Sequence, residues 1–248
     1  MPIVVFMDLD DTLFQTATKT PDGSSLDIAA VDREGKPLSF ITSRQKQFFR
    51  WLDTHAIVIP TTARNTDAYR RVQLRFRHGA IVSFGAVILD ENGVPNSKWM
   101  SIVRPQIEMM QNELNGLEED ALESCVADPS VRVRLVREGG LAVYLVAKST
   151  DGDASKLQHL YSSWRELARK GSFFVHFNGN NLSLVPDCLG KEKAVRFVCE
   201  ELFQGSELVT IGIGDSLTDA SFMSSCHFVM MPRHSQIFES LLSRRMDV

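Results

Sequence analysis

The chain begins with a short apolar run that ends at closely spaced carboxylates. Residues 2–7 (PIVVFM) are rich in β-branched side chains, and Asp8 and Asp10 follow at once. A run of this kind is typical of a strand that is buried on both faces of a parallel sheet. Ligands of open parallel sheets bind beyond the carboxyl ends of the strands. The sequence therefore predicts an α/β fold with its chemistry at Asp8 and Asp10.

Strand and helix patterns alternate after this first strand. Two apolar runs around a charged, glycine-containing turn predict a hairpin over residues 26–41. Ser43 is placed to cap a helix over 43–54. The next apolar run, 57–60, ends in Pro60, which marks the end of a strand because proline cannot donate to a sheet ladder. A basic helix is expected over 67–77.

From Gly79 onward the pattern changes to strand pairs with fewer helices. Such a stretch predicts a compact α+β insert with a mostly antiparallel sheet, placed between two halves of a parallel-sheet domain. The elements expected in it are a strand pair over 80–94, helices over 105–126 and 154–170, and strands over 131–136, 141–147, 172–177 and 181–186.

An α/β pattern returns after the insert, and it brings a second group of carboxylates. A helix over 191–203 is followed by a strand over 208–214, which ends at Asp215 and Asp219. Because the carboxyl ends of parallel strands meet at one edge of a sheet, we expect these residues to join Asp8 and Asp10. The remaining expected elements are a short strand over 227–231 and a closing helix over 236–243.

Composition narrows the class of protein. With 248 residues, of which 44% are hydrophobic, the chain can bury a substantial core. The formal net charge of -4 offers no general attraction to nucleic acid or to an anionic membrane, so we expect neither as a partner. The four cysteines lack zinc-type spacing, and the first residues lack the features of a signal peptide or membrane span. A cytoplasmic protein is expected.

A group of carboxylates at one sheet edge needs a cation, because like charges repel. The candidate ligands are all oxygen atoms, without histidine or thiolate nearby, which favours Mg²⁺ over Zn²⁺. On these residues alone, several kinds of metal site are equally compatible with the pattern.

Four motifs in a fixed order narrow the choice: DLDDT at residues 8–12, Thr62 after a later strand, Lys191 at a helix start, and GDSLTD at residues 214–219. In this order they resemble the haloacid dehalogenase superfamily of phosphohydrolases, whose core domain is a Rossmann-like α/β sheet. The resemblance implies that Asp8 attacks phosphorus and forms an aspartyl phosphate, while Asp10 protonates the leaving alcohol and later activates water.

The resemblance also implies a ligand set for the metal. Mg²⁺ would be bound by the Asp8 carboxylate, the backbone carbonyl of Asp10 and Asp215. Asp219 would either orient the motif lysine or hold a metal-bound water. Many relatives have asparagine, often a metal ligand, where this chain has Thr218, so the resemblance leaves the metal ligands near Asp219 open.

Phosphate binding is implied for Thr62 and Lys191, which would donate to the phosphoryl oxygens and balance their charge. Each has a neighbour that competes for the role, namely Thr61 and Lys193. Thr62 is also suited simply to cap the following helix. Arg64, which follows alanine where relatives have glycine, is expected either to contact the substrate or to form a structural salt bridge.

The position of the insert resembles a C2-type cap, as in the sucrose phosphatase, mannosylglycerate phosphate phosphatase, phosphomannomutase and Cof-like sugar phosphatase subgroup. We expect residues 1–83 and 187–248 to form the core and 84–186 the cap. In the cap, Asn178, Asn180 and Asn181 suit sugar hydroxyls or a simple turn. Two arginines that alternate along one strand, Arg132 and Arg134, are expected either to bind a second anionic group of the substrate or simply to lie on an exposed face of the sheet.

The expected function is that of a Mg²⁺-dependent phosphatase acting on a small phosphate monoester, with a sugar phosphate as the family-level substrate. Three alternatives stay open. A phosphomutase would use the same nucleophile, a silent module of the same fold would only bind a phospho-ligand, and a receiver domain also phosphorylates an aspartate. The receiver domain is disfavoured by its shorter length and by the different placement of its acidic residues.

Overall fold

The computed structural model describes residues 1–20, 25–204 and 207–245. The chain divides into two compact units, which we call the first unit (Met1–Asn96 with Lys191–Val248) and the second unit (Ser97–Gly190). The expected junctions were at residues 84 and 187. The first junction lies later in the chain because the hairpin of β5 (Ala80–Val82) and β6 (Val87–Leu89) is bonded to the chain of the first unit, where the Thr62 amide donates to the Ile81 carbonyl at 2.9 Å.

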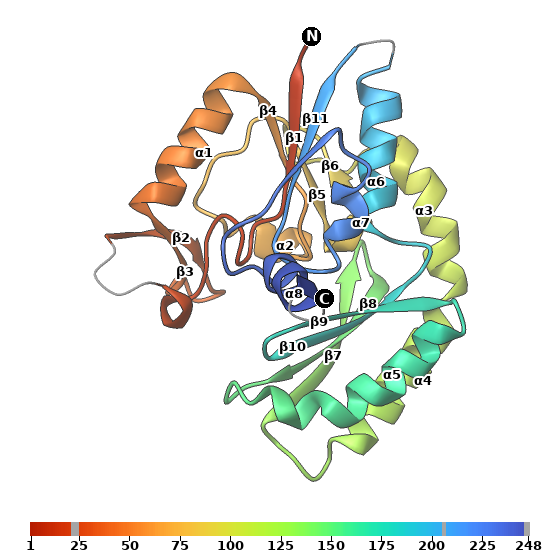
Figure 1. The fold of residues 1–248 in the computed structure, drawn as a ribbon. Coiled ribbons are helices and arrows are strands. Elements are labelled where there is room, and N and C mark those ends of the chain that lie inside the picture. Colours follow the sequence, from red (N-terminus) through yellow and green to blue (C-terminus); the bar gives the residue numbers. More distant parts are fainter. Residues whose placement is uncertain (21–24, 205–206, 246–248) are drawn as a thin grey trace. The chain divides into compact units, whose positions relative to one another are not determined.

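The first unit is built on a parallel sheet of four strands, in the order β12-β11-β1-β4, of which β11, β1 and β4 are labelled in Figure 1. Strand β1 (Ile3–Met7) lies between β11 (Val209–Ile213) and β4 (Ile57–Pro60), and β12 (Phe228–Met230) pairs with β11. Residues 4–7 are fully buried, as a central strand of a parallel sheet requires. The α/β prediction is confirmed, and Pro60 is the last residue of its strand as expected.

The hairpin of β2 (Leu26–Val31) and β3 (Pro37–Thr42) is present, and it leads directly into α1 (Ser43–His55). The predicted cap of this helix was wrong by one residue. Thr42 is the N-cap, since its hydroxyl accepts from the Gln45 amide while the Gln45 side chain accepts from the Thr42 amide. This reciprocal pair is a capping box.

The helix predicted over residues 67–77 is mostly absent, since α2 covers only Thr66–Tyr69. The following segment instead runs beside β2, where the Gln73 amide donates to the Ala29 carbonyl. Val72, Leu74 and Phe76 pack against the core of the first unit. Their spacing of two residues suits an extended chain and not a helix, which would need a spacing of three or four.

A strained turn joins β5 to β6. Ser83, Phe84 and Gly85 all have positive φ angles, of 53°, 55° and 90°, and all three are buried. Positive φ is unfavourable for a bulky residue such as phenylalanine. Two backbone hydrogen bonds hold the turn in place. The Ser83 amide donates to the Arg64 carbonyl, and the Phe84 amide donates to the Thr62 carbonyl. It therefore fixes the loop that follows β4.

In the second segment of the first unit, from Lys191 onward, the helices are short. They are α6 (Lys191–Phe197), which continues as a π-helical turn over Val198–Leu202, then α7 (Ala220–Met223) and α8 (Gln236–Arg245). Among the described residues of both units, no helix is long and apolar enough to cross a membrane.

The second unit is a separate antiparallel sheet packed on helices (Figure 1). Its strand order is β7-β8-β10-β9, with β7 over Val131–Glu138, β8 over Leu141–Ser149, β9 over Phe173–Asn178 and β10 over Asn181–Pro186. Leu145 and Leu182 of the sheet pack in one cluster with Leu160 and Trp164 of α5 (Gln158–Arg169), which follows a 3-10 turn over Ala154–Leu157.

The helix predicted over residues 105–126 is in fact two helices, α3 (Ser97–Met109) and α4 (Gln111–Ser124). Pro105 lies inside α3 and does not begin it. The apolar face of α3 starts earlier, because Trp99, Val103 and Ile107 are buried at a spacing of four residues.

Candidate active site

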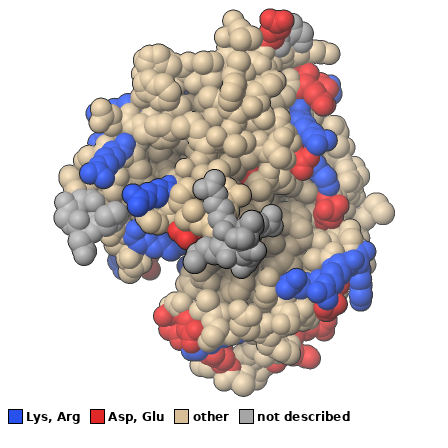
Figure 2. Space-filling view, in the orientation of Figure 1, with Lys and Arg blue, Asp and Glu red and all other residues tan. Residues whose placement is uncertain are grey.

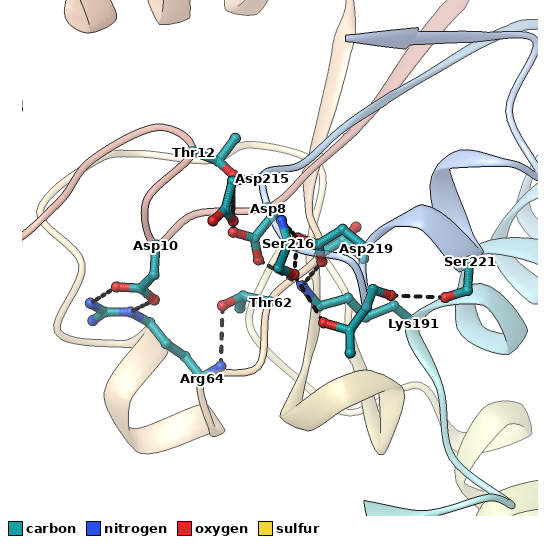
Figure 3. A network of polar contacts seen from close by, with 12 residues as sticks. Asp8, Asp10, Thr12, Thr62, Arg64, Lys191, Asp215, Ser216, Asp219 and Ser221 are labelled. Carbon is teal, nitrogen blue, oxygen red and sulfur yellow. Dashed lines mark hydrogen bonds and ion pairs between the residues drawn. The ribbon is translucent and has the colours of Figure 1, made fainter. Parts of the chain in front are cut away.

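Parallel pairing brings three strand ends to one edge of the sheet. The Asp8 amide donates to the Ile213 carbonyl at 2.8 Å, and the Thr61 amide donates to the Met7 carbonyl at 2.8 Å. Strand β1 is therefore bonded on both sides up to its last residue. The loops after β1, β4 and β11 begin side by side, and they carry most of the side chains shown in Figure 3. Lys191, at the start of α6, and Ser221, in α7, are the labelled residues that lie outside these loops.

Lys191 joins two of the buried carboxylates. Its Nζ donates to Asp8 Oδ1 and to Asp219 Oδ1, both at 2.6 Å, and all three side chains are buried. Burial on its own lowers the pKa of Lys191, but attraction to the two carboxylates outweighs it and raises that pKa. The lysine is therefore held as a cation. The competing Lys193 is exposed two residues further along α6.

Asp219 is held at both of its oxygens. While Oδ1 accepts from Lys191, Oδ2 accepts from the hydroxyl of Ser216 at 2.6 Å and from its amide at 3.1 Å. Burial alone raises the pKa of Asp219, yet the attraction of Lys191 and these hydrogen bonds lower it overall. Gly214 makes the approach possible, since a Cβ there would lie 2.6 Å from the Asp219 Cβ.

Asp215 lies beside Asp8, and Thr12 connects them. The Thr12 hydroxyl is 3.2 Å from Asp8 Oδ2 and 3.3 Å from Asp215 Oδ1. Burial, reinforced by Asp219 and Asp11, raises the pKa of Asp215 to about 7. Burial is also the main reason that the pKa of Asp8 lies well above its usual range. For both groups, the attraction of Lys191 offsets only part of the effect of burial and of the neighbouring carboxylates.

The carboxylates of Asp8, Asp215 and Asp219 each offer an oxygen within 4.8 Å of the others. Lys191 balances one of these three charges, so a divalent cation would balance the other two. The ligand atoms are all carboxylate oxygens, which suit hard divalent cations such as Mg²⁺, Ca²⁺ and Mn²⁺. The residues therefore fit a divalent metal site.

The loop after β4 places Thr62 with its hydroxyl ready to donate. Thr62 is buried, and its Oγ1 accepts from the Arg64 amide at 3.1 Å, so its own hydrogen is left to donate elsewhere. The hydroxyl of Thr61 instead donates to the Ile59 carbonyl at 3.3 Å, within its own chain segment. Of these two threonines, Thr62 is therefore the one whose hydroxyl hydrogen is available to a ligand.

Asp10 points toward Arg64 (Figure 3). The guanidinium donates from Nε to Asp10 Oδ2 and from Nη2 to Asp10 Oδ1, both at 2.7 Å. It also donates to the buried Ser39 of β3 at 3.2 Å and lies over the Phe14 ring, 5.0 Å from its centroid. Burial alone lowers the pKa of Arg64, and its bonds to Asp10 raise it overall.

The candidate residues of the insert all lie in the second unit. Asn180 belongs to the turn between β9 and β10, and its side chain donates to the Ser149 carbonyl at 2.8 Å. Asn178 is the last residue of β9 and faces Asn181 across the pair. Arg132 and Arg134 are exposed on β7, on the face opposite to the one that packs against the helices.

Figure 2 shows basic and acidic side chains in small separate groups on the face drawn.

Three polar residues of the site were not singled out from the sequence. Thr12 and Ser216 each lie within a motif and directly beside its aspartates, so proximity was an available signal. Ser39 lies in a hairpin strand far from any motif, and its role depends on how β3 packs against Arg64. No local pattern marks such a residue.

No family model matches the chain, and no curated protein matches it either. Solved structures do. A trehalose-6-phosphate phosphatase related protein is 16% identical and has a TM-score of 0.56, with 98% of this chain and 99% of that chain covered. The sucrose-phosphatase of Synechocystis sp. PCC6803, solved with sucrose and phosphate, is 13% identical with a TM-score of 0.52 and coverage of 99% and 98%.

A haloacid dehalogenase-like hydrolase from Bacteroides thetaiotaomicron is 12% identical, with a TM-score of 0.50 and coverage of 100% of this chain and 99% of that chain. These likenesses span both units, including the parallel sheet of the first and the antiparallel sheet of the second. The chain therefore has the haloacid dehalogenase-like hydrolase fold, as its sequence motifs predicted.

Proposed function

We propose that this protein is a Mg²⁺-dependent phosphatase that hydrolyses a small phosphate monoester through an aspartyl phosphate on Asp8. The observation that carries the proposal is the buried group of Asp8, Lys191 and Asp219, with Asp215 beside it. A carboxylate can attack a dianionic phosphate only where cations offset the repulsion. This group supplies one such cation and the ligands for another.

In the first step, an oxygen of Asp8 forms a bond to phosphorus and the ester P–O bond breaks. Asp10 gives a proton to the departing alkoxide. Asp10 then takes a proton from water, whose oxygen attacks phosphorus, and the bond from phosphorus to Asp8 breaks. Inorganic phosphate leaves and both aspartates return to their initial state.

The other residues bind and orient the phosphoryl group. Lys191 balances charge on Asp8 and on the phosphate, and Asp219 with Ser216 holds the ammonium in place. Thr62 donates its hydroxyl to a phosphoryl oxygen. Mg²⁺, held by Asp8, Asp215 and the Asp10 backbone carbonyl, would neutralise the phosphoryl oxygens during the transfer.

The leaving group is proposed to be a sugar, with the second unit acting as the cap that contacts it. Support comes from the likeness over both units to the trehalose-6-phosphate phosphatase related protein and to the sucrose-phosphatase solved with sucrose. Asn178 and Asn180 in the turn region of β9 and β10 are the residues we propose for the hydroxyls.

The test is phosphate release from p-nitrophenyl phosphate and a panel of sugar phosphates, with and without Mg²⁺, by wild type and Asp8→Asn. An amide is a poor nucleophile, so we expect a loss of about three orders of magnitude or more. The matched control is Asp27→Asn, which removes an exposed carboxylate paired with Lys46 and should retain activity. Full activity of Asp8→Asn would contradict the mechanism, and transfer of label within one sugar without release of phosphate would indicate a mutase.

A further inference from the structure

Arg64 was expected to contact the substrate or to form a structural salt bridge, and it forms a salt bridge, whose partner is the candidate acid and base Asp10. Two parallel hydrogen bonds of 2.7 Å join its guanidinium to both oxygens of Asp10. The planar fork of a guanidinium matches a carboxylate in this way and fixes its orientation as well as its position. The pair therefore defines where the Asp10 carboxylate lies.

The guanidinium is itself held from two further sides. Ser39 accepts from Nη2 at 3.2 Å, and the Phe14 ring covers the guanidinium face. Only 11% of the Arg64 side chain is exposed, against 46% for Asp10. The arginine is thus the fixed partner, and the aspartate is the one that solvent can reach.

The supporting hairpin is tied to the same loop that carries Asp10. The amides and carbonyls of Gln15 and Phe40 bond to each other, at 3.0 and 2.7 Å, which joins β3 to the chain after the DLDDT motif. The side chains of Gln15 and Gln45 form a further bond of 2.7 Å. Ser39 therefore sits on a strand whose place relative to Asp10 is set by the backbone.

We propose that Arg64 is a positioning residue for Asp10, and that the β2–β3 hairpin acts through Ser39 to keep the guanidinium in place. This inference rests on the proposed function, because it needs Asp10 to exchange a proton with the leaving group and with water. Its consequence is that Arg64 contributes through Asp10 and not through contact with the substrate.

A double-mutant cycle distinguishes positioning of Asp10 from contact with the substrate. Substitutions of coupled residues change the activity non-additively, whereas those of independent residues change it additively. The four proteins are wild type, Arg64→Met, Asp10→Asn and the double variant. The substrate is p-nitrophenyl phosphate, whose leaving group departs without a proton, so that the Asp10→Asn proteins stay measurable. A sugar phosphate is assayed in parallel with wild type and Arg64→Met.

With p-nitrophenyl phosphate as the substrate, we expect Arg64→Met to lower kcat by roughly 10- to 100-fold, while KM changes by less than about threefold. In the Asp10→Asn background the same substitution should cost less than about twofold. Arg64→Lys keeps the charge but loses the fork, so it should recover only part of the activity. If Arg64→Met does not fold, Arg64→Lys takes its place in the cycle under the same criterion.

The matched control is Arg77→Met, which removes a more exposed arginine paired with Asp53 and should leave kcat unchanged. An equal loss in both backgrounds, or a loss that appears in KM, would overturn the inference and assign Arg64 to the substrate. A wild-type protein without Mg²⁺-dependent hydrolysis would overturn the proposed function, and this inference with it. An active wild type with additive effects overturns the inference alone.

Discussion

The ammonium group of Lys191 donates a 2.6 Å hydrogen bond to Asp8, although the two residues are 183 positions apart in the chain. One lies at the end of β1 and the other begins α6, after the whole second unit has intervened. The bond is buried, as is the matching bond from Lys191 to Asp219. The first unit can therefore complete its site only when both of its segments have folded together.

Replacement of Lys191 by methionine should strongly destabilise the protein. The change leaves Asp8 and Asp219 buried without their cation, and breaking a buried pair in this way costs about 3–5 kcal/mol. The predicted loss of stability is checked by measuring the free energy of unfolding by urea denaturation at pH 7.5 without Mg²⁺. Lys193→Met, on the exposed side of the same helix, should change it by less than about 0.5 kcal/mol. Similar stability of the two variants would argue against the buried cluster.

Stabilisation by Mg²⁺ should depend on pH. In the metal-free protein the pKa of Asp215 is raised to about 7, so below pH 7 a proton competes with the cation for this carboxylate. The raised pKa also means that the stability contributed by this group is present below about pH 4 and is lost as pH rises through 7. The increase in Tm on adding Mg²⁺ should therefore be larger at pH 8 than at pH 5.5.

The control for this pH dependence is Asp215→Asn, which cannot gain or lose a proton at this position. Its Tm should respond weakly to Mg²⁺ at both pH values, because a metal ligand and its charge are lost together. A wild-type response that is equal at pH 5.5 and pH 8 would count against Asp215 as a ligand.

Gly214→Ala should disturb the site, whereas Gly116→Ala should not. A Cβ on Gly214 would meet the Asp219 Cβ at 2.6 Å and the Met223 sulfur at 3.0 Å, so Asp219 must move away from Lys191. Overpacking of this kind costs about 1–3 kcal/mol. Activity should fall with it, because Asp219 orients the ammonium.

Gly116 lies inside α4, and a Cβ there would meet nothing within 4 Å. Alanine is the better helix former, so Gly116→Ala should raise the free energy of unfolding by about 0.5–1 kcal/mol and leave turnover unchanged. Thermal denaturation and p-nitrophenyl phosphate hydrolysis of both variants check the pair. Equal activity of the two variants would show that Asp219 tolerates displacement.

The fold class was predictable because its signals are local. The runs that form β1, β4 and β11 are apolar and short, and each ends at a proline, a glycine or a carboxylate. The two wrong helices show the limit of such signals. The segment after Tyr69 is polar enough to resemble a surface helix, yet it runs extended because Val72, Leu74 and Phe76 find their partners in the first unit.

By itself the sequence determined which side chains stand at the strand ends, and hence that Asp8, Thr62 and Asp215 are offered at one edge of a parallel sheet. Local hydrophobic patterns specify where strands stop, so these positions could be read in advance. Tertiary structure alone decided the partners: Lys191 between Asp8 and Asp219, and Arg64 on Asp10 with Ser39 behind it. Such contacts join segments far apart in the chain, and their geometry depends on packing that no local pattern contains.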